Sequence, residues 1–528
     1  MQQNEEATLE PGGLPQGECG CRRRLAKTAC GVPGKLRSRW PEWSTLLAYA
    51  ALVAFAIPYH EPWADEAQAW QLARNLSLAA LFKTFIRYEG SPGLWHFLLW
   101  IMIRFHVSYA GLHWICGAIA TAAVWLLVFR SPFPRYLRLS LPFTSFLLFQ
   151  YAVVARNYVL VPLLLFLVAI AWKKSPFGLA LALGLLANAS LHTAVISGGL
   201  VAIYVIEKVR NRKIEPIEPR RNLLLCALLL LVFYAFAIWT AWPPHDLNLS
   251  MVRGQPSDYF MRGVFSLVWP TCQPWIVSIP FWAAIVLWFH ARRKLYFLLP
   301  VLFFAVFSGE VWLVWWHAGL LIPLLICLLW ITWHAPGTVL RDLENAGRIA
   351  LAVMIVTQIL WSGYALFYDH YYAYSADLAA EKFLSPYVGE GASIAVTYVN
   401  EDSNKRVRAF TAVGILPYFD RNIYANTPYP FWWWSDKDLS DERFNALLPS
   451  HPRIVLVEET HHAPIARLNL SDPKYTSLMK DGYKFVNGFC GTQPLQLQLG
   501  ETLCHVIFEY SGQSISSVKQ AQDNSLKR

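Results

Sequence analysis

Two adjacent carboxylates, Asp65 and Glu66, stand in the segment HEPWADEAQAW, directly after the first long apolar run of the chain. Carboxylates of this kind act as a general base, a general acid or a metal ligand. With Trp63 and Trp70 close by, one acid can sit in apolar surroundings while the other meets a cation, which would give the two groups different protonation states. The acidic pair is therefore the first candidate for chemistry.

A structural interpretation of the same two residues is equally open. Both acids would stand in the first turn of an amphipathic surface helix running from Glu66 to Phe85. Negative charge stabilises a helix N-terminus, so this placement needs no catalytic role.

Arg156 is the candidate cation. It lies in QYAVVARNYVL, between two apolar runs, and Tyr158 follows it closely. An ionisable side chain in the bilayer zone marks a functional site by default, because an unpaired charge is costly there. A guanidinium is suited to bidentate binding of phosphate, so Arg156 and Tyr158 are the expected phosphate-binding residues.

Four further side chains are candidates for the lining of a substrate pocket. Glu89 and His96 flank the SPG turn, where they would reach the same pocket as Asp65 or form only the polar rim of a membrane-entry helix. His192 and His317 are single histidines near the expected outer ends of spans, where structural hydrogen bonding is the commoner role.

The composition is that of a polytopic membrane protein. Of the 528 residues, 55% are hydrophobic and 15% charged, and apolar runs recur from Ser44 to Tyr368. Runs such as Leu223 to Trp242 carry almost no charge over about 20 residues, enough to cross a bilayer. The net charge of +10 comes mainly from basic clusters that flank these runs. This distribution indicates membrane topology rather than nucleic-acid binding.

The positive-inside rule orients the chain. The polar, basic tail 1–42 is expected to be disordered and cytoplasmic, which places the loop 60–93 outside. Basic connectors at 207–221, 291–294 and 341–348 are expected on the cytoplasmic side. The predicted apolar segments are Trp43–Tyr59, Gly93–Phe105, Gly111–Phe129, Leu139–Val154, Tyr158–Trp172, Phe177–Ala189, Ala194–Ile206, Leu223–Trp242, Cys272–His290, Leu295–Phe307, Val311–Trp333 and Ile349–Tyr368.

This list conflicts with the rule at one point. Two spans before Arg130 would place the basic connector 130–138 outside, and an even number of spans cannot join a cytoplasmic N-terminus to an external C-terminus. One short segment is therefore miscounted, either a half-membrane helix near Leu139–Val154 or a split of a Pro-interrupted region. The expectation is 11 to 13 spans, from apolar runs of about 20 residues.

A domain of ordinary soluble composition is expected at 375–510, outside the cytoplasm. Ser393–Val399, Arg453–Glu459 and Cys504–Tyr510 have the pattern of strands and Ala376–Leu384 that of a helix, which predicts a small α/β layer. Thr427–Asp436 is expected to be an exposed aromatic loop that anchors at the membrane interface or covers the site. The tail 511–528 is predicted to be disordered.

The nine cysteines divide into three groups. Cys490 and Cys504 would form a disulfide if this domain faces an oxidising compartment. Cys19, Cys21 and Cys30 lack the paired spacing of a zinc site and are expected to be free thiols. The others fall within or beside apolar runs and act as small hydrophobic residues: Cys116, Cys226, Cys272 and Cys327.

Three motifs, EPWADEAQAW, YEGSPGLWHFLLW and ARNYVL, together resemble the bacterial GT-C membrane glycosyltransferases. These are relatives of the protein O-mannosyltransferases and of the aminoarabinose transferases that act on lipid A. The resemblance implies that Asp65 is the catalytic base or a metal-assisted acid, with Glu66 at the second acidic position. Many members carry His-Pro-Pro where this chain has Ser91-Pro92-Gly93, so a role for that histidine carries over only if His96 replaces it.

The resemblance implies an all-α GT-C domain at 43–370 that transfers a sugar, with inversion, from a polyprenyl-phosphate donor. The acceptor would be a glycan, lipid or protein outside the cytoplasm of a bacterial inner membrane. Membrane lipid is an expected partner and nucleic acid is not. No ligand cluster demands a metal, and if an ion takes part, oxygen ligands favour magnesium or manganese.

Two other function classes stay open. A transporter or flippase of lipid-linked intermediates would show internal repeats and charges at mid-membrane. A non-catalytic membrane scaffold would need the loop 427–436 but not Asp65.

Overall fold

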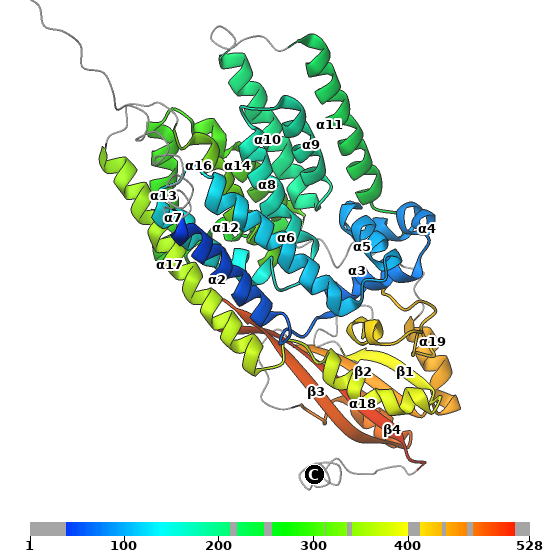
Figure 1. The fold of residues 1–528 in the computed structure, drawn as a ribbon. Helices are drawn as coiled ribbons and strands as arrows, with labels where there is room; N and C mark the ends of the chain where they lie inside the picture. Colours follow the sequence, from blue (N-terminus) through cyan, green and yellow to red (C-terminus); the bar gives the residue numbers. More distant parts are fainter. Residues whose placement is uncertain are drawn as a thin grey trace, which may run out of the picture.

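The computed structural model describes residues 39–211, 219–247, 256–311, 313–334, 341–399, 412–435, 440–461 and 468–512. It is mostly helical, with a small sheet near the C-terminus (Figure 1). This confirms the prediction of a mostly helical protein with a small C-terminal α/β unit, and the apolar helices are consistent with a membrane protein. Most of both predicted disordered tails, and Cys19, Cys21 and Cys30, lie outside the described residues.

Five helices in the described part of the chain are long and apolar enough to cross a membrane. α11 is almost entirely apolar yet leaves side chains such as Leu224 and Leu231 exposed, as expected for a lipid-facing helix. The helix at 315–332 is largely buried and forms the centre of the bundle. The five are α6 (Tyr109–Arg130), α10 (Leu191–Arg210), α11 (Arg220–Ala241), α15 with α16 (Trp315–Ala318 and Leu321–Thr332) and α17 (Arg341–Tyr371).

Shorter apolar helices pack between and around these. Several begin at a proline or at a serine that caps the first turn; Ser175, for example, accepts a hydrogen bond from the N–H of Gly178. They are α2 (Trp40–Ala56), α8 (Leu160–Ala171), α9 (Pro176–Ala187), α12 (Tyr259–Val268), α13 (Trp275–Ala291) and α14 (Leu299–Glu310).

The segment Gly93–Phe105 forms only a short helix. Its helix, α5 (Leu94–Arg104), has 11 residues and is about 16 Å long, half the thickness of a hydrocarbon core. It packs against α3 at one end of the bundle (Figure 1). At the other end, Arg135 and Arg138 each lie 3.2 Å from Glu42 at the start of α2. The basic connector and the start of α2 are therefore at the same end of the bundle.

Leu139–Val154 was predicted as one apolar segment, but it does not form one continuous helix. The chain there breaks into α7 (Arg135–Ser140), a 3-10 turn (Leu141–Phe143) and a π-helical turn (Phe146–Gln150). Pro142 lacks an N–H for continuing α7, and the following residues turn irregularly until Arg156.

The predicted surface helix from Glu66 to Phe85 is wrong in both extent and exposure. α3 (Ala64–Asn75) ends early, and Ser77 starts α4 (Leu78–Lys83) by accepting a hydrogen bond from the N–H of Ala80. Most of α3 is buried, because the C-terminal domain covers it.

The C-terminal sheet has the order β1-β2-β4-β3, in which β1 and β2 are parallel and the other pairs antiparallel. The predicted strands and helix are confirmed as β1 (Ile394–Val399), β2 (Ile454–His461), β4 (Gln498–Tyr510) and α18 (Asp377–Gly389). β3 (Tyr483–Leu495) was not predicted, because glycine, proline and two bulges interrupt the alternation of apolar and polar residues. Apolar side chains alternate between a face shared with α18 and one shared with α19 (Ser440–Leu447) and α20 (Pro473–Lys480).

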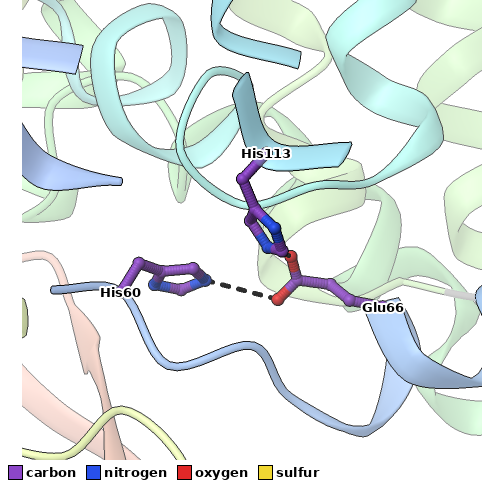
Figure 2. A group of neighbouring side chains, drawn as sticks. All are labelled: His60, Glu66 and His113. Carbon is purple, nitrogen blue, oxygen red and sulfur yellow. Dashed lines mark hydrogen bonds and ion pairs between the residues drawn. The ribbon is translucent and has the colours of Figure 1, made fainter. Parts of the chain in front are cut away.

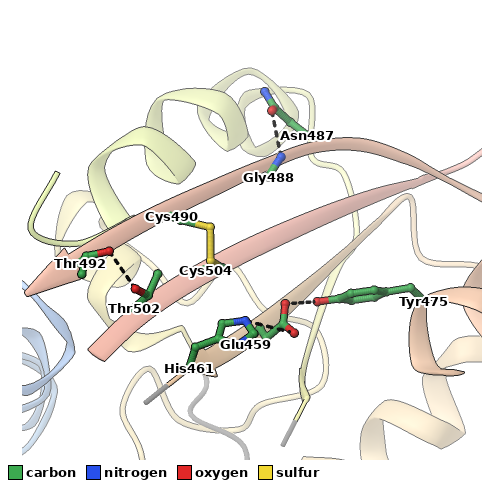
Figure 3. The surroundings of a disulfide bond; sticks show 9 residues. All are labelled: Glu459, His461, Tyr475, Asn487, Gly488, Cys490, Thr492, Thr502 and Cys504. Atoms are coloured by element: carbon green, nitrogen blue, oxygen red, sulfur yellow. Dashed lines mark hydrogen bonds and ion pairs between the residues drawn. A yellow bond between two sulfur atoms is a disulfide. The ribbon is translucent and has the colours of Figure 1, made fainter. Parts of the chain in front are cut away.

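The disulfide expected between Cys490 and Cys504 is present and joins the paired strands β3 and β4 (Figure 3). The side chains of Thr492 and Thr502 share a hydrogen bond of 2.8 Å on the same two strands. Cys116, Cys272 and Cys327 are free and buried, as expected for small hydrophobic residues within or beside apolar runs, and Cys226 is half-buried on α11.

Candidate functional site

Asp65, the expected catalytic base, and Arg156, the expected phosphate-binding cation, form an ion pair. Asp65 stands in the first turn of α3, and Arg156 lies just before the 3-10 turn Asn157–Val159 that leads into α8. The Arg156 guanidinium donates to Oδ2 of Asp65. The side chain of Asp65 is 27% exposed and that of Arg156 is 18% exposed, so the pair is accessible from outside the protein. Within the described residues, Oδ1 of Asp65 has no hydrogen-bond partner.

Three aromatic rings surround Arg156. Its guanidinium carbon lies 5.6 Å from the ring centre of Trp63 and 5.3 Å from those of Tyr158 and Trp316. The rings of Trp63 and Trp316 meet edge to face, with their centres 5.0 Å apart. Contacts of this kind stabilise a guanidinium and fix its plane. Arg156 is therefore held in place, with a part of its surface still open.

Glu66 occupies a different environment from its neighbour, with a fully buried side chain. Its Oε1 lies 3.3 Å from Nε2 of His60, and its Oε2 lies 3.0 Å from Nε2 of His113 on α6 (Figure 2). The backbone N–H of Ala155 also donates to Oε2, over 2.5 Å. Burial alone would raise the pKa of Glu66, but the two histidines outweigh it and hold that pKa well below its usual range.

His60 links this network to the last spanning helix. Its Nδ1 lies 3.1 Å from Oδ1 of Asp369, near the end of α17. Burial opposes a charge on His60, but Asp369 and Glu66 outweigh it and raise the pKa to about 10. The network thus joins the first loop to α6, to α17 and to the backbone beside Arg156.

The C-terminal domain covers the same region through Gln68. The amide of Gln68 donates to the backbone oxygen of Trp432 and accepts from its N–H, each over 2.8 Å. Phe431 and Trp432 are buried, so the expectation of an exposed loop at Thr427–Asp436 is wrong for these two residues. Position 436 itself is outside the described residues.

Gln68 also donates to Oε1 of Glu89 over 2.9 Å. Burial raises the pKa of Glu89 to about 7. The negative charge of Asp65 also raises this pKa, whereas the hydrogen bond from Gln68 and the positive charge of Arg156 lower it. Glu89 therefore changes its charge near neutral pH, within electrostatic reach of the Asp65–Arg156 pair.

Of the three predicted pocket histidines, His192 and His317 lie against each other, and His96 is buried separately on α5. The rings of His192 and His317 have centres 4.2 Å apart, and His317 lies against the ring of Tyr158 at 5.6 Å. Burial lowers the pKa of His96 to about 4, and the positive charge of Arg156 lowers it further. Within the described residues, neither ring nitrogen of His96 nor Nδ1 of His317 has a hydrogen-bond partner, although all three atoms are buried. Unpaired buried donors and acceptors of this kind suit a hydroxyl-rich ligand.

The structure therefore brings the eight predicted site residues into one region, although it separates the roles of Asp65 and Glu66. The sequence interpretation missed the partners that fix them: His60, His113, Asp369, Gln68 and Trp316. The only signals were a histidine directly before the acidic loop and ionisable residues near the ends of apolar runs, which are too common to single out a network.

Comparison with known proteins adds no assignment. No protein-family model matches this chain, and no curated protein sequence matches it significantly.

Among the described residues, one group of histidine, cysteine and acidic side chains could hold a metal ion, formed by His60, Glu66 and His113. Two imidazoles and one carboxylate do not match the oxygen-rich ligand set that magnesium prefers. Asp65, which the magnesium or manganese interpretation would need, is paired with Arg156 instead.

Proposed function

We propose that this protein is an integral-membrane glycosyltransferase of GT-C type that moves a sugar from a polyprenyl phosphate to a hydroxyl of a glycan, lipid or protein. The observation that carries the proposal is the accessible pair of Asp65 and Arg156. It supplies one carboxylate and one fixed cation, the two groups that transfer from a lipid phosphate requires.

In the proposed reaction, Asp65 takes the proton of the acceptor hydroxyl through its unpaired oxygen. The acceptor oxygen attacks the anomeric carbon of the donor as the bond from that carbon to the phosphate oxygen breaks. The phosphate leaves with both electrons of this bond, and Arg156 balances its growing negative charge. The product is an inverted glycoside, together with free polyprenyl phosphate and a protonated Asp65.

Other residues have supporting roles in this proposal. Tyr158, Trp63 and Trp316 fix the guanidinium plane. His96, His192 and His317 lie where the sugar hydroxyls would bind. Glu66 is fully buried and saturated with hydrogen bonds, so its role is positioning rather than proton transfer.

The proposed topology has eleven crossings and a cytoplasmic N-terminus. Arg138 lies at the end of the bundle where α2 starts and Arg156 at the opposite end, so the irregular segment 141–156 crosses although it is not a regular helix. The other crossings are α2, α6, α8, α9, α10, α11, α13, α14, α16 and α17. An odd number places the disulfide-bonded domain and Asp65 together outside the cytoplasm, where disulfides persist.

The test is sugar transfer in membranes supplied with radiolabelled polyprenyl-phosphate sugars. Asp65→Asn keeps the size and the contact with Arg156 but removes the base, and we expect turnover to fall about 10²- to 10⁴-fold at matched expression. Asp258→Asn, at an exposed aspartate far along the chain, is the matched control and should retain full transfer. Equal transfer by wild type and Asp65→Asn would contradict the proposed mechanism.

A transporter or flippase would behave differently in the same membranes. It would move labelled lipid across the bilayer without forming a new glycoside, whether or not Asp65 is present. Product analysis therefore separates the two classes.

A further inference from the structure

The buried residues His60, Glu66 and His113 have an arrangement that hydrogen bonding alone explains poorly. Both ring nitrogens of His60 face carboxylate oxygens, at 3.1 Å from Asp369 and 3.3 Å from Glu66. Both ring nitrogens of His113 also face acceptors, Oε2 of Glu66 at 3.0 Å and the backbone oxygen of Tyr109 at 3.3 Å. An imidazole must be doubly protonated to donate from both nitrogens, so the network without an ion needs two buried imidazolium groups.

A divalent metal ion would resolve this arrangement at the same net charge. Two imidazolium groups beside the carboxylates of Glu66 and Asp369 sum to zero, and so does one divalent ion with two neutral imidazoles and the same two carboxylates. The Nε2 atoms would then bind the ion, and each Nδ1–H would donate to the acceptor it already faces. Burying one compensated ion avoids placing two separate cationic rings away from water.

The surroundings match the outer shell of known metal sites. A metal-binding histidine almost always donates its second N–H to a carboxylate or a backbone carbonyl. His60 has the carboxylate of Asp369 in this position, and His113 has the carbonyl of Tyr109. The three inner ligand atoms lie within 4.8 Å of one another. Ligands of a tetrahedral zinc ion, bound at about 2 Å, lie about 3.3 Å apart. Here Nε2 of His60 lies 3.3 Å from Oε1 of Glu66 and Nε2 of His113 lies 3.0 Å from Oε2, so a carboxylate that binds through both oxygens would complete a set of four ligand atoms.

We infer that His60, Glu66 and His113 form a structural site for a divalent transition-metal ion, with zinc as the best match for two imidazoles and one carboxylate. The site is closed, because its side chains are almost fully buried. A closed site is typical of a structural ion. The ion would fix the first loop to α6, next to Asp65, and would not itself take part in sugar transfer.

The test measures metal content, so its outcome does not depend on the proposed transfer reaction. Tag-free protein in detergent is loaded with zinc, passed over a desalting column and analysed by mass spectrometry of the elements. We expect about one ion per chain in the wild type. His60→Gln and His113→Gln, which keep a polar side chain of similar size, should lose it. His290→Ala removes an exposed histidine of α13 and should retain it.

Thermal unfolding provides the second measurement. A chelator should lower the midpoint for wild type and His290→Ala, and zinc but not magnesium should restore it. Folded His113→Gln should respond to neither. Retention of one ion by the folded glutamine variants would overturn the site.

If the variants do not fold, measurements on the wild type alone test whether the metal site exists. Zinc X-ray absorption should then show two imidazole nitrogens and carboxylate oxygen around the ion. Absence of a stoichiometric ion after loading, a sulfur-containing ligand shell, or a midpoint unaffected by its removal would each overturn the inference and leave an ion-pair network.

Discussion

Glu66 accepts a hydrogen bond of 2.5 Å from the backbone N–H of Ala155. Each of the two residues is adjacent to a member of the ion pair, because Asp65 precedes Glu66 and Arg156 follows Ala155. Two consecutive residues of the first loop thus bind two consecutive residues before α8. This double contact fixes the direction in which the Asp65–Arg156 pair faces, and the buried network of Glu66 anchors it.

The two neighbouring acids should therefore differ in their effect on stability. Glu66→Gln leaves the buried His60 and His113 without the carboxylate that they share, which costs about 3 to 5 kcal/mol for a broken buried pair. Asp65→Asn removes a partly exposed charge and should cost at most about 1 kcal/mol. Thermal unfolding in detergent, calibrated by chemical unfolding, measures both. Equal losses for the two variants would contradict the separation of their roles.

Arg156→Lys should weaken donor binding although it keeps the positive charge. The lysine ammonium cannot present two parallel N–H groups to a phosphate, and it stacks less well between Trp63 and Trp316. We expect the KM for the donor to rise about 10- to 100-fold. Arg348→Lys, at an exposed residue of α17, is the matched control. An unchanged KM would remove Arg156 from phosphate binding.

The pKa of Glu89, raised to about 7 by burial, predicts a pH dependence of donor binding. Below pH 7 Glu89 is neutral; above it, a second negative charge appears near Asp65 and repels an anionic phosphodiester. The donor KM should thus increase as the pH rises through 7, and Glu89→Gln should remove the increase. The same shift means that the folded state holds this proton more tightly than the unfolded chain, so its contribution to stability declines as the pH rises from 4.5 to 7.

Gln68 provides an independent check on this assignment. Its hydrogen bond favours the charged form of Glu89 and lowers the pKa. Gln68→Ala should therefore move the midpoint of the pH profile upward. It should also destabilise the contact with Trp432, whose backbone groups lose two partners. A midpoint that stays in place would show that another group titrates.

Removal of the disulfide should destabilise the C-terminal domain without abolishing its fold. Cys490 and Cys504 are 14 residues apart, and closing a loop of this length restricts the unfolded chain by about 3 kcal/mol. We expect the double serine variant to lose a stability of this order, because the β3–β4 pairing persists. Peptide mapping without reduction should find the two cysteines linked in the wild type. Free thiols at both positions would contradict both the disulfide and an external location of the domain.

The pattern of apolar residues along the chain predicted part of the fold. It identified the helical bundle and three of the four strands, because burial in lipid or in a core imposes a local pattern of residue types. It did not predict the broken backbone at 141–150, since a run of apolar residues does not reveal where the chain leaves regular helical geometry. Nor did it show which ends of the segments lie together, whereas the ion pairs of Glu42 with Arg135 and Arg138 place the basic connector beside the start of α2.

The candidate site divides in the same way. Residue type alone marked Asp65, Glu66 and Arg156, because charged groups in an apolar chain are costly and need a function or a partner. Which acid faces outward and which is buried depends on His60, His113 and Asp369, and the last of these lies more than 300 residues away from the first loop. Such contacts leave no local pattern, so only the tertiary structure assigned Asp65 to the accessible pair and Glu66 to the buried network.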